Sequence, residues 1–184
     1  MTTRIIKNVE QFAKKYCKDE IIKSGYEDQK LWENHIQLVR KYALQLAEIE
    51  SADKFVVEVA ALLHDIGKYQ GRESHAERSY ELSKEFLKSL NIESNKVNLI
   101  LKCIRFHGSK HSGEEHEIEV KIVQCADALG TIFDDEWQEH SRKTMDKKTL
   151  LGLFDKTYSK INLASAKKIA KPQIKKLRQI VLSM

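Results

Sequence analysis

Proline, glycine and cysteine are all scarce in this sequence of 184 residues. One Pro and seven Gly are fewer than the turns of a β-rich architecture need, so the composition favours helices. The three cysteines are far apart and form no CxxC pair, which argues against a disulfide framework and against a thiolate zinc site. Because reduced thiols are typical of cytosolic proteins, we expect a cytoplasmic location.

Long apolar runs are also lacking. The first residues become charged before a run of signal length develops, and no segment approaches the length that spans a bilayer. We therefore expect no export signal and no membrane partner. The net charge is +5, with many lysines after Lys143. A solvated helix face explains these lysines better than a nucleic-acid surface, and attraction of an anionic substrate is the alternative.

Apolar residues recur at helical spacing along almost the whole chain, and no strand-like alternation is present. The pattern predicts helices over about residues 3–23, 29–50, 53–64, 95–107, 117–134, 146–159 and 162–183, with another from His75 through Leu90. Ser74 and Glu77 predict a capping box at the start of that helix. We expect Gly67 to end the helix over 53–64, and Pro172 to begin a new helix or kink the last one.

Several ionisable residues lie on apolar helix faces or at their ends, namely His35, His64, Asp65, His75, His107 and Asp127. A buried carboxylate without a partner is costly, so two carboxylates among several histidines suggest a shared cation. Imidazole and carboxylate ligands together suit Fe, Mn, Co, Ni or Zn, whereas all-oxygen sites suit Mg and Ca. A single His on an apolar helix face is more often a core residue with its hydrogen bonds made than a metal ligand. The prediction of a metal site therefore depends on all of these residues, from different helices, meeting at one place.

The segment ALLHDIGK at residues 61–68 resembles the signature of the HD-domain superfamily of metal-dependent phosphohydrolases. An upstream His lies in WENHIQLVRKYALQLAE and a distant Asp in VQCADALG, in the order that the family has, so the resemblance covers about residues 30–130. It implies an all-α, single-domain bundle of the HD type. A metal-binding helical domain over residues 1–140 would carry C-terminal helices, residues 141–184, packed on it.

The resemblance also implies the ligands. Carried over by motif, the residues that match the metal-binding positions are His35, His64, Asp65 and Asp127. Many members place two further histidines between the doublet and the last Asp, where they hold a second metal. His75 and His107 fit those places, although the gap from Asp65 to His75 is short for the pattern. The implied cofactor is one or two divalent transition-metal ions, with Mg possible, and both metal counts stay open.

The implied reaction is hydrolysis of a phosphate ester or anhydride, with a nucleotide as the expected small anionic substrate. A metal-activated hydroxide would attack, and Asp65 would bridge the metals. Lys68, as a catalytic residue, would neutralise phosphate charge. Candidates for substrate contact are Lys68, Arg72, Lys110 and His111, with a plain surface role as the competing interpretation. His111 and His116 are most simply solvated loop residues, although either one touching substrate or replacing His107 stays open.

Two other functions fit the same residues. Some relatives with this fold and ligand set are di-iron oxygenases, and ligands alone do not determine the metal. A non-catalytic module that keeps the site for a ligand or for stability is the third interpretation. The complete ligand set argues against it, and metal identity with oxygen consumption would separate the other two.

Overall fold

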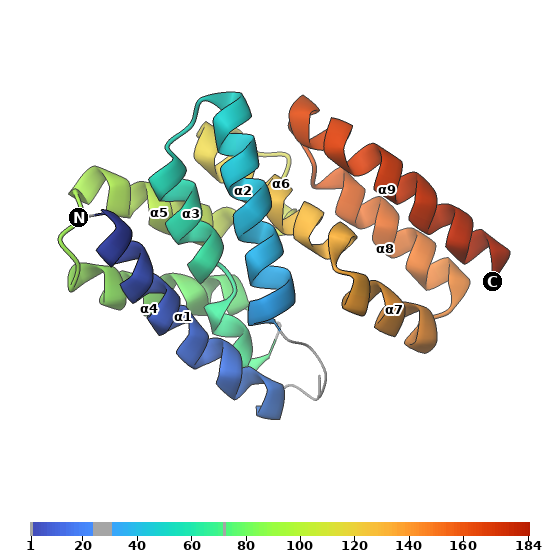
Figure 1. The fold of residues 1–184 in the computed structure, drawn as a ribbon, viewed down its shortest axis with the longest axis horizontal. Helices are drawn as coiled ribbons and strands as arrows, with labels where there is room; N and C mark the ends of the chain where they lie inside the picture. Colours follow the sequence, from blue (N-terminus) through green and yellow to red (C-terminus); the bar gives the residue numbers. More distant parts are fainter. Residues whose placement is uncertain (1, 24–30, 72) are drawn as a thin grey trace.

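The protein is all-helical, as predicted. The computed structural model describes residues 2–23, 31–71 and 73–184, and no strand occurs within these ranges (Figure 1). Its elements, with η marking short 3₁₀ or π helices, are α1 (Thr2–Lys23), η1 (Trp32–Ile36), α2 (Gln37–Glu50), α3 (Lys54–Leu63), η2 (Ile66–Gln70), α4 (His75–Lys88), α5 (Ser94–Phe106), η3 (Ser109–His111), α6 (Ile118–Phe133), α7 (Asp135–Thr144), α8 (Lys147–Ser159) and α9 (Ala164–Ser183).

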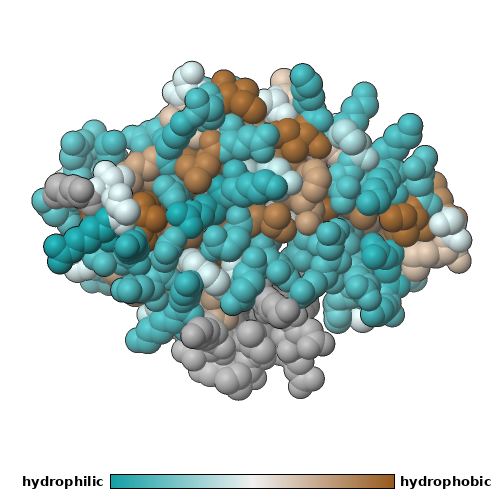
Figure 2. Space-filling view, viewed as in Figure 1, coloured by the Kyte–Doolittle hydropathy of each residue, from teal (hydrophilic) through white to brown (hydrophobic). Residues whose placement is uncertain are grey.

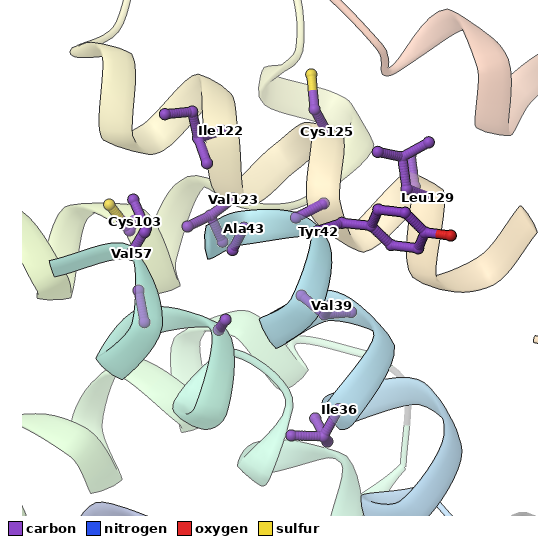
Figure 3. Packing of buried hydrophobic residues seen from close by; sticks show 14 of the residues in the cluster. Ile36, Val39, Tyr42, Ala43, Val57, Cys103, Ile122, Val123, Cys125 and Leu129 are labelled. Atoms are coloured by element: carbon purple, nitrogen blue, oxygen red, sulfur yellow. The ribbon is translucent and has the colours of Figure 1, made fainter. Parts of the chain in front are cut away.

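Helices α2, α3 and α6 form the centre of the molecule. Figure 3 shows Ala43 of α2 beside Val123 of α6 and Tyr42 of α2 beside Leu129 of α6, and all four side chains are buried. Helix α3 is apolar on nearly every side and fully buried over most of its length, as its sequence predicts. Burial of this apolar surface, at about 25 cal/mol per Å², is the main stabilising contribution. It fixes the helices from which the predicted metal ligands project.

The remaining N-terminal helices close over this centre. The Phe12 ring of α1 stacks on Phe86 of α4 with 3.9 Å between ring centroids. Arg40 of α2 joins α1 to α3, because its guanidinium donates to Glu10 at 2.7 Å and to Glu58 at 2.9 Å. These contacts hold α1 and α4 against the side of the bundle where the ligands lie.

Helices α7, α8 and α9 gather at the end of the long axis opposite the N-terminus (Figure 1). The sequence patterns did not predict α7, because its residues are mostly polar. Its N-terminus is capped by Asp134, whose carboxylate accepts from the Trp137 N–H at 2.9 Å. An Asp at this position is a common N-cap, and it was the sequence signal from which the start of α7 could have been predicted. Because α7 runs across position 140, the division into residues 1–140 and 141–184 stays a prediction.

Two local predictions were wrong. Gly67 does not end α3, which stops at Leu63; it lies in η2 against the backbone of α4. Ser74 precedes α4 as predicted but makes no side-chain cap; its backbone is left-handed, with a φ of 52°, whereas a capping residue normally has an extended backbone. Of the two outcomes predicted for Pro172, a new helix does not begin there, since α9 continues through it at an exposed position; a kink in α9 stays a prediction.

The surface is mainly hydrophilic. Figure 2 shows polar side chains over most of one face, with hydrophobic residues in separate patches. All three cysteines are buried. Among the described residues no helix is long and apolar enough to cross a membrane.

Candidate metal centre

Four helical segments and two short turns bring the predicted ligands together. His35 lies in η1, a π-helical turn in which the Ile36 N–H donates to the Leu31 carbonyl at 2.9 Å. Such widened turns are frequent at functional sites. His64 and Asp65 directly follow α3, and Asp127 lies within α6. His75 is the first residue of α4 and His107 follows α5. The predicted helix start at about residue 29 lies outside the described residues.

The first cluster consists of His35, His64, Asp65 and Asp127, and all four are buried. Each offers a ligand atom within 4.8 Å of the others. His35 Nε2 lies 3.3 Å from Asp65 Oδ2 and 3.2 Å from Asp127 Oδ1. His64 Nε2 lies 3.2 Å from Asp65 Oδ2 and 3.8 Å from Asp127 Oδ1. Two imidazoles and two carboxylates thus surround one point.

The second cluster consists of Asp65, His75 and His107. His75 Nε2 lies 3.3 Å from Asp65 Oδ1, and His107 Nε2 lies 3.6 Å from the same oxygen. The two Nε2 atoms are 3.1 Å apart. Despite the short sequence gap from Asp65, His75 therefore reaches the centre. The η2 turn brings it back, because the chain reverses there and α4 begins beside Asp65.

Asp65 belongs to both clusters through different oxygens. Its Oδ2 faces His35 and His64, and its Oδ1 faces His75 and His107. Within the described part of the chain, His35 Nε2, His64 Nε2 and Asp65 Oδ1 are buried without a hydrogen-bond partner. Buried polar atoms are rarely left unpaired. Two of these atoms face the first cluster and the third faces the second, an arrangement that fits one or two divalent ions held by these residues.

Hydrogen bonds on the outer side of two rings fix which nitrogen is available. His64 Nδ1 donates to the Ala61 carbonyl at 2.8 Å, and His107 Nδ1 donates to the Ile104 carbonyl at 2.7 Å. Because a carbonyl only accepts, the proton resides on Nδ1 and the lone pair on Nε2. This is the arrangement that orients metal-binding histidines.

Two lysines contact the carboxylates. Lys68 Nζ pairs with Asp65 Oδ2, and Lys160 Nζ pairs with Asp127 Oδ2. Burial raises the pKa of Asp65, but the electrostatic influence of His64 and Lys68 outweighs it and holds that pKa well below its usual range. For Asp127, burial is likewise outweighed, chiefly by Lys160, and the pKa lies well below its usual value. Both groups are therefore carboxylates, the form that binds metal.

Two glycines allow the close packing around the ligands. A Cβ on Gly67 would lie 2.6 Å from the Ser79 nitrogen of α4 and nearer still to the His75 carbonyl oxygen. A Cβ on Gly130 would lie 2.6 Å from Val39 Cγ2 and 3.3 Å from His35 Nδ1. Gly67 thus lets α4 place His75, and Gly130 leaves room for the His35 ring.

The centre opens into a cavity of about 950 Å³. Its lining includes Lys68 and Lys110, both predicted to contact substrate. His111 is absent from the lining among the described residues. It hydrogen-bonds Glu114 at 2.8 Å, so its role with substrate stays a prediction. Arg72 lies outside the described residues. His116 stacks on Phe106, with 5.1 Å between ring centroids.

The opposite wall of the cavity comes from the C-terminal helices. Trp137 and His140 of α7, Lys156 of α8, and Lys160 directly after α8 line it. Sequence reasoning assigned none of these to the site. No local signal marks them, because only the packing of α7 and α8 beside α6 brings them near Asp127.

Comparisons with known structures agree with this architecture. Selenomethionine-containing YpgQ of Bacillus subtilis is similar with a TM-score of 0.70 and 20% identity, covering 100% of this chain and 95% of that chain. A predicted HD superfamily hydrolase from an uncultured Thermotogales bacterium has a TM-score of 0.65 and 20% identity, covering 96% of this chain and 89% of its own. YpgQ in complex with ADP has a TM-score of 0.63 and 23% identity, covering 100% of this chain and 95% of that chain.

At these identities the likeness shows the fold. A search of curated proteins returns no significant match. A profile of the HD domain family, however, matches residues 32–132. That span is more than half of the chain and contains every residue of both clusters. The chain belongs to the HD domain family.

Proposed function

We propose that this protein is a metal-dependent phosphohydrolase that cleaves a phosphate ester or anhydride, with a nucleotide as the substrate class. The observation that carries the proposal is the position of Asp65, whose two oxygens face two separate histidine pairs at 3.2–3.6 Å. His35, His64, Asp65 and Asp127 would hold one divalent ion. Asp65, His75 and His107 would hold a second. Divalent ions in such a pair supply a hydroxide nucleophile near neutral pH and offset phosphoryl charge.

The chain's own residues prepare the cavity for a phosphate. Lys68 contacts Asp65 and lines the cavity, so its ammonium lies where negative charge develops on the phosphoryl oxygens. Lys110 lines the same cavity and is proposed to contact substrate. The same role is proposed for Arg72 and His111 from the sequence alone. The buried carbonyl contacts of His64 and His107 keep both rings from rotating as the substrate binds.

Two further observations support the substrate class and the compartment. The structurally similar YpgQ of Bacillus subtilis forms a complex with ADP, which supports a nucleotide as substrate. The three cysteines are buried and far apart in the sequence, with no CxxC pair, which supports a reducing, cytoplasmic location.

The test is metal analysis of the purified protein, followed by phosphate release from nucleotides and simple phosphoesters with the metal found. We expect activity that chelator abolishes and that Asp65→Asn lacks. Asp155→Asn is the matched control, since Asp155 is exposed on α8. Oxygen consumption by an iron-loaded protein without phosphate release would establish the oxygenase instead. Bound metal with neither activity would establish a non-catalytic module.

A further inference from the structure

The charge of this chain is divided between its two parts. Residues 141–184 contain twelve Lys and Arg against two Asp, whereas residues 1–140 contain 20 basic and 25 acidic side chains. The part that holds the metal ligands is therefore net negative, and the C-terminal helices are strongly positive. Cations that only keep a helix face in water can lie anywhere on that face. A lysine that lines the cavity of the metal centre is therefore the one to consider for contact with a substrate.

Lys156 and Lys160 stand apart from the other C-terminal lysines because they line the metal-centre cavity. They are four residues apart, at the end of α8 and just beyond it, which places them on one side of the helix. Lys160 is half-buried and pairs with the outer oxygen of Asp127. Lys156 is exposed and forms no ion pair with any residue that the structure describes. Lys143 also lines the cavity, but Glu139 neutralises it at 2.6 Å.

The two lysines extend the positive charge outward from the metal centre. Lys68 contacts Asp65 and Lys160 contacts Asp127, and His35 Nε2 lies between these carboxylates at 3.3 and 3.2 Å. Lys156 and Lys160 are four residues apart, about 6 Å along the helix axis at ~1.5 Å per residue. A group that spans from the metal centre to Lys156 is therefore larger than a single phosphate at the metal centre.

We propose that Lys156 and Lys160 form a phosphate subsite on the C-terminal side of the cavity, built for a chain of two or more phosphates. Lys160 contacts the phosphate at the metal centre, and Lys156 contacts the next one along the chain. The helices after residue 140 thus contribute to substrate selection. This inference rests on the proposed function, because it takes the reacting phosphate to lie at the metal centre.

The experiment compares two nucleotides that differ in one phosphate. AMP and the non-hydrolysable α,β-methylene analogue of ADP are titrated calorimetrically into the metal-loaded protein and its variants. We expect wild type to bind the diphosphate analogue more tightly than AMP. Lys156→Ala should weaken binding of the analogue by about tenfold or more, the scale of one charged contact, and leave AMP affinity unchanged. Lys160→Ala should weaken both.

The matched control is Lys148→Ala, an exposed residue of α8 that is absent from the cavity lining; it should bind both nucleotides as wild type does. Metal content is measured on every variant, so that loss of metal is not mistaken for loss of a phosphate contact. Unchanged binding of the analogue by Lys156→Ala, or failure of wild type to bind it at all, would overturn the subsite. Binding that follows the expected pattern without turnover of any phosphate substrate would instead refute the phosphohydrolase.

Discussion

Replacing Gly67 by Ala tests how the second ligand cluster is assembled. Gly67 lies in η2 against α4, where its N–H donates to Ser79 Oγ at 2.8 Å and its carbonyl accepts from Arg78 Nε at 2.8 Å. A Cβ there would lie 2.6 Å from the Ser79 nitrogen and 2.8 Å from Arg78 Cβ. Backbone atoms cannot rotate away as a side chain can. The helix α4 must therefore shift, and His75 at its first residue shifts with it.

The size of the effect follows from these distances. Ordinary Cβ contacts begin at 3.4 Å, so α4 must move by roughly 1 Å, and overpacking of this kind costs about 1–3 kcal/mol. A domain of this length loses about 2–4 °C in Tm per kcal/mol. Ligand sets tolerate displacements of only about 0.5 Å. We expect lower stability together with weaker metal binding by Asp65, His75 and His107, while the cluster of His35 and Asp127 keeps its metal.

Thermal unfolding and metal counting measure both consequences. Gly152→Ala is the matched control, because Gly152 is an exposed helical residue of α8 with no atom within 4 Å of an added Cβ. That substitution should stabilise the protein by up to about 1 kcal/mol, since Ala favours helix interiors. The same chemical change should thus have opposite signs at the two positions. A Gly67→Ala protein as stable as wild type with full metal content would refute the close approach of η2 and α4.

Three further results are expected. Lys68→Ala should keep its metal and fold but lose about tenfold to a thousandfold in kcat for phosphate release, with partial recovery in Lys68→Arg; an unchanged kcat would make Lys68 a surface residue. His75→Ala should lower the metal content measured by mass spectrometry towards one ion per chain, and full content would exclude His75 as a ligand. The pKa of Asp53 lies below its usual value. Burial alone would raise this pKa, but hydrogen bonds from Lys96 and from two backbone N–H groups stabilise the carboxylate more strongly. The ion pair between Asp53 and Lys96 therefore stabilises the fold fully at pH values above about 3.9, the pKa of Asp in the unfolded chain. This stabilisation is lost as the pH falls through the lower pKa that Asp53 has in the folded protein. Urea unfolding should show Asp53→Asn less stable by about 1 kcal/mol or less at pH 7, with the difference shrinking below pH ~4. A difference independent of pH would contradict this.

The sequence alone determined the helical fold and the candidates for the first cluster. Apolar periodicity is local, and it predicted α2, α3 and α6 because burial of their faces drives the fold. The costly placement of His64, Asp65 and Asp127 among apolar residues was equally visible in the sequence. The resemblance at HDIGK added the expected order of ligands.

Only the tertiary structure decided how the parts meet. Asp65 lies between two histidine pairs because the chain turns back at η2 and brings His75 beside it. The short sequence gap between Asp65 and His75 gave no sign of this reversal. Gly67 had the signal of a helix end, yet its role is to let another helix approach. Lys156 and Lys160 looked like any solvated lysines, since no local pattern tells which face of α8 points to Asp127. Such relations depend on packing between segments far apart in the chain, which periodicity and capping rules do not describe.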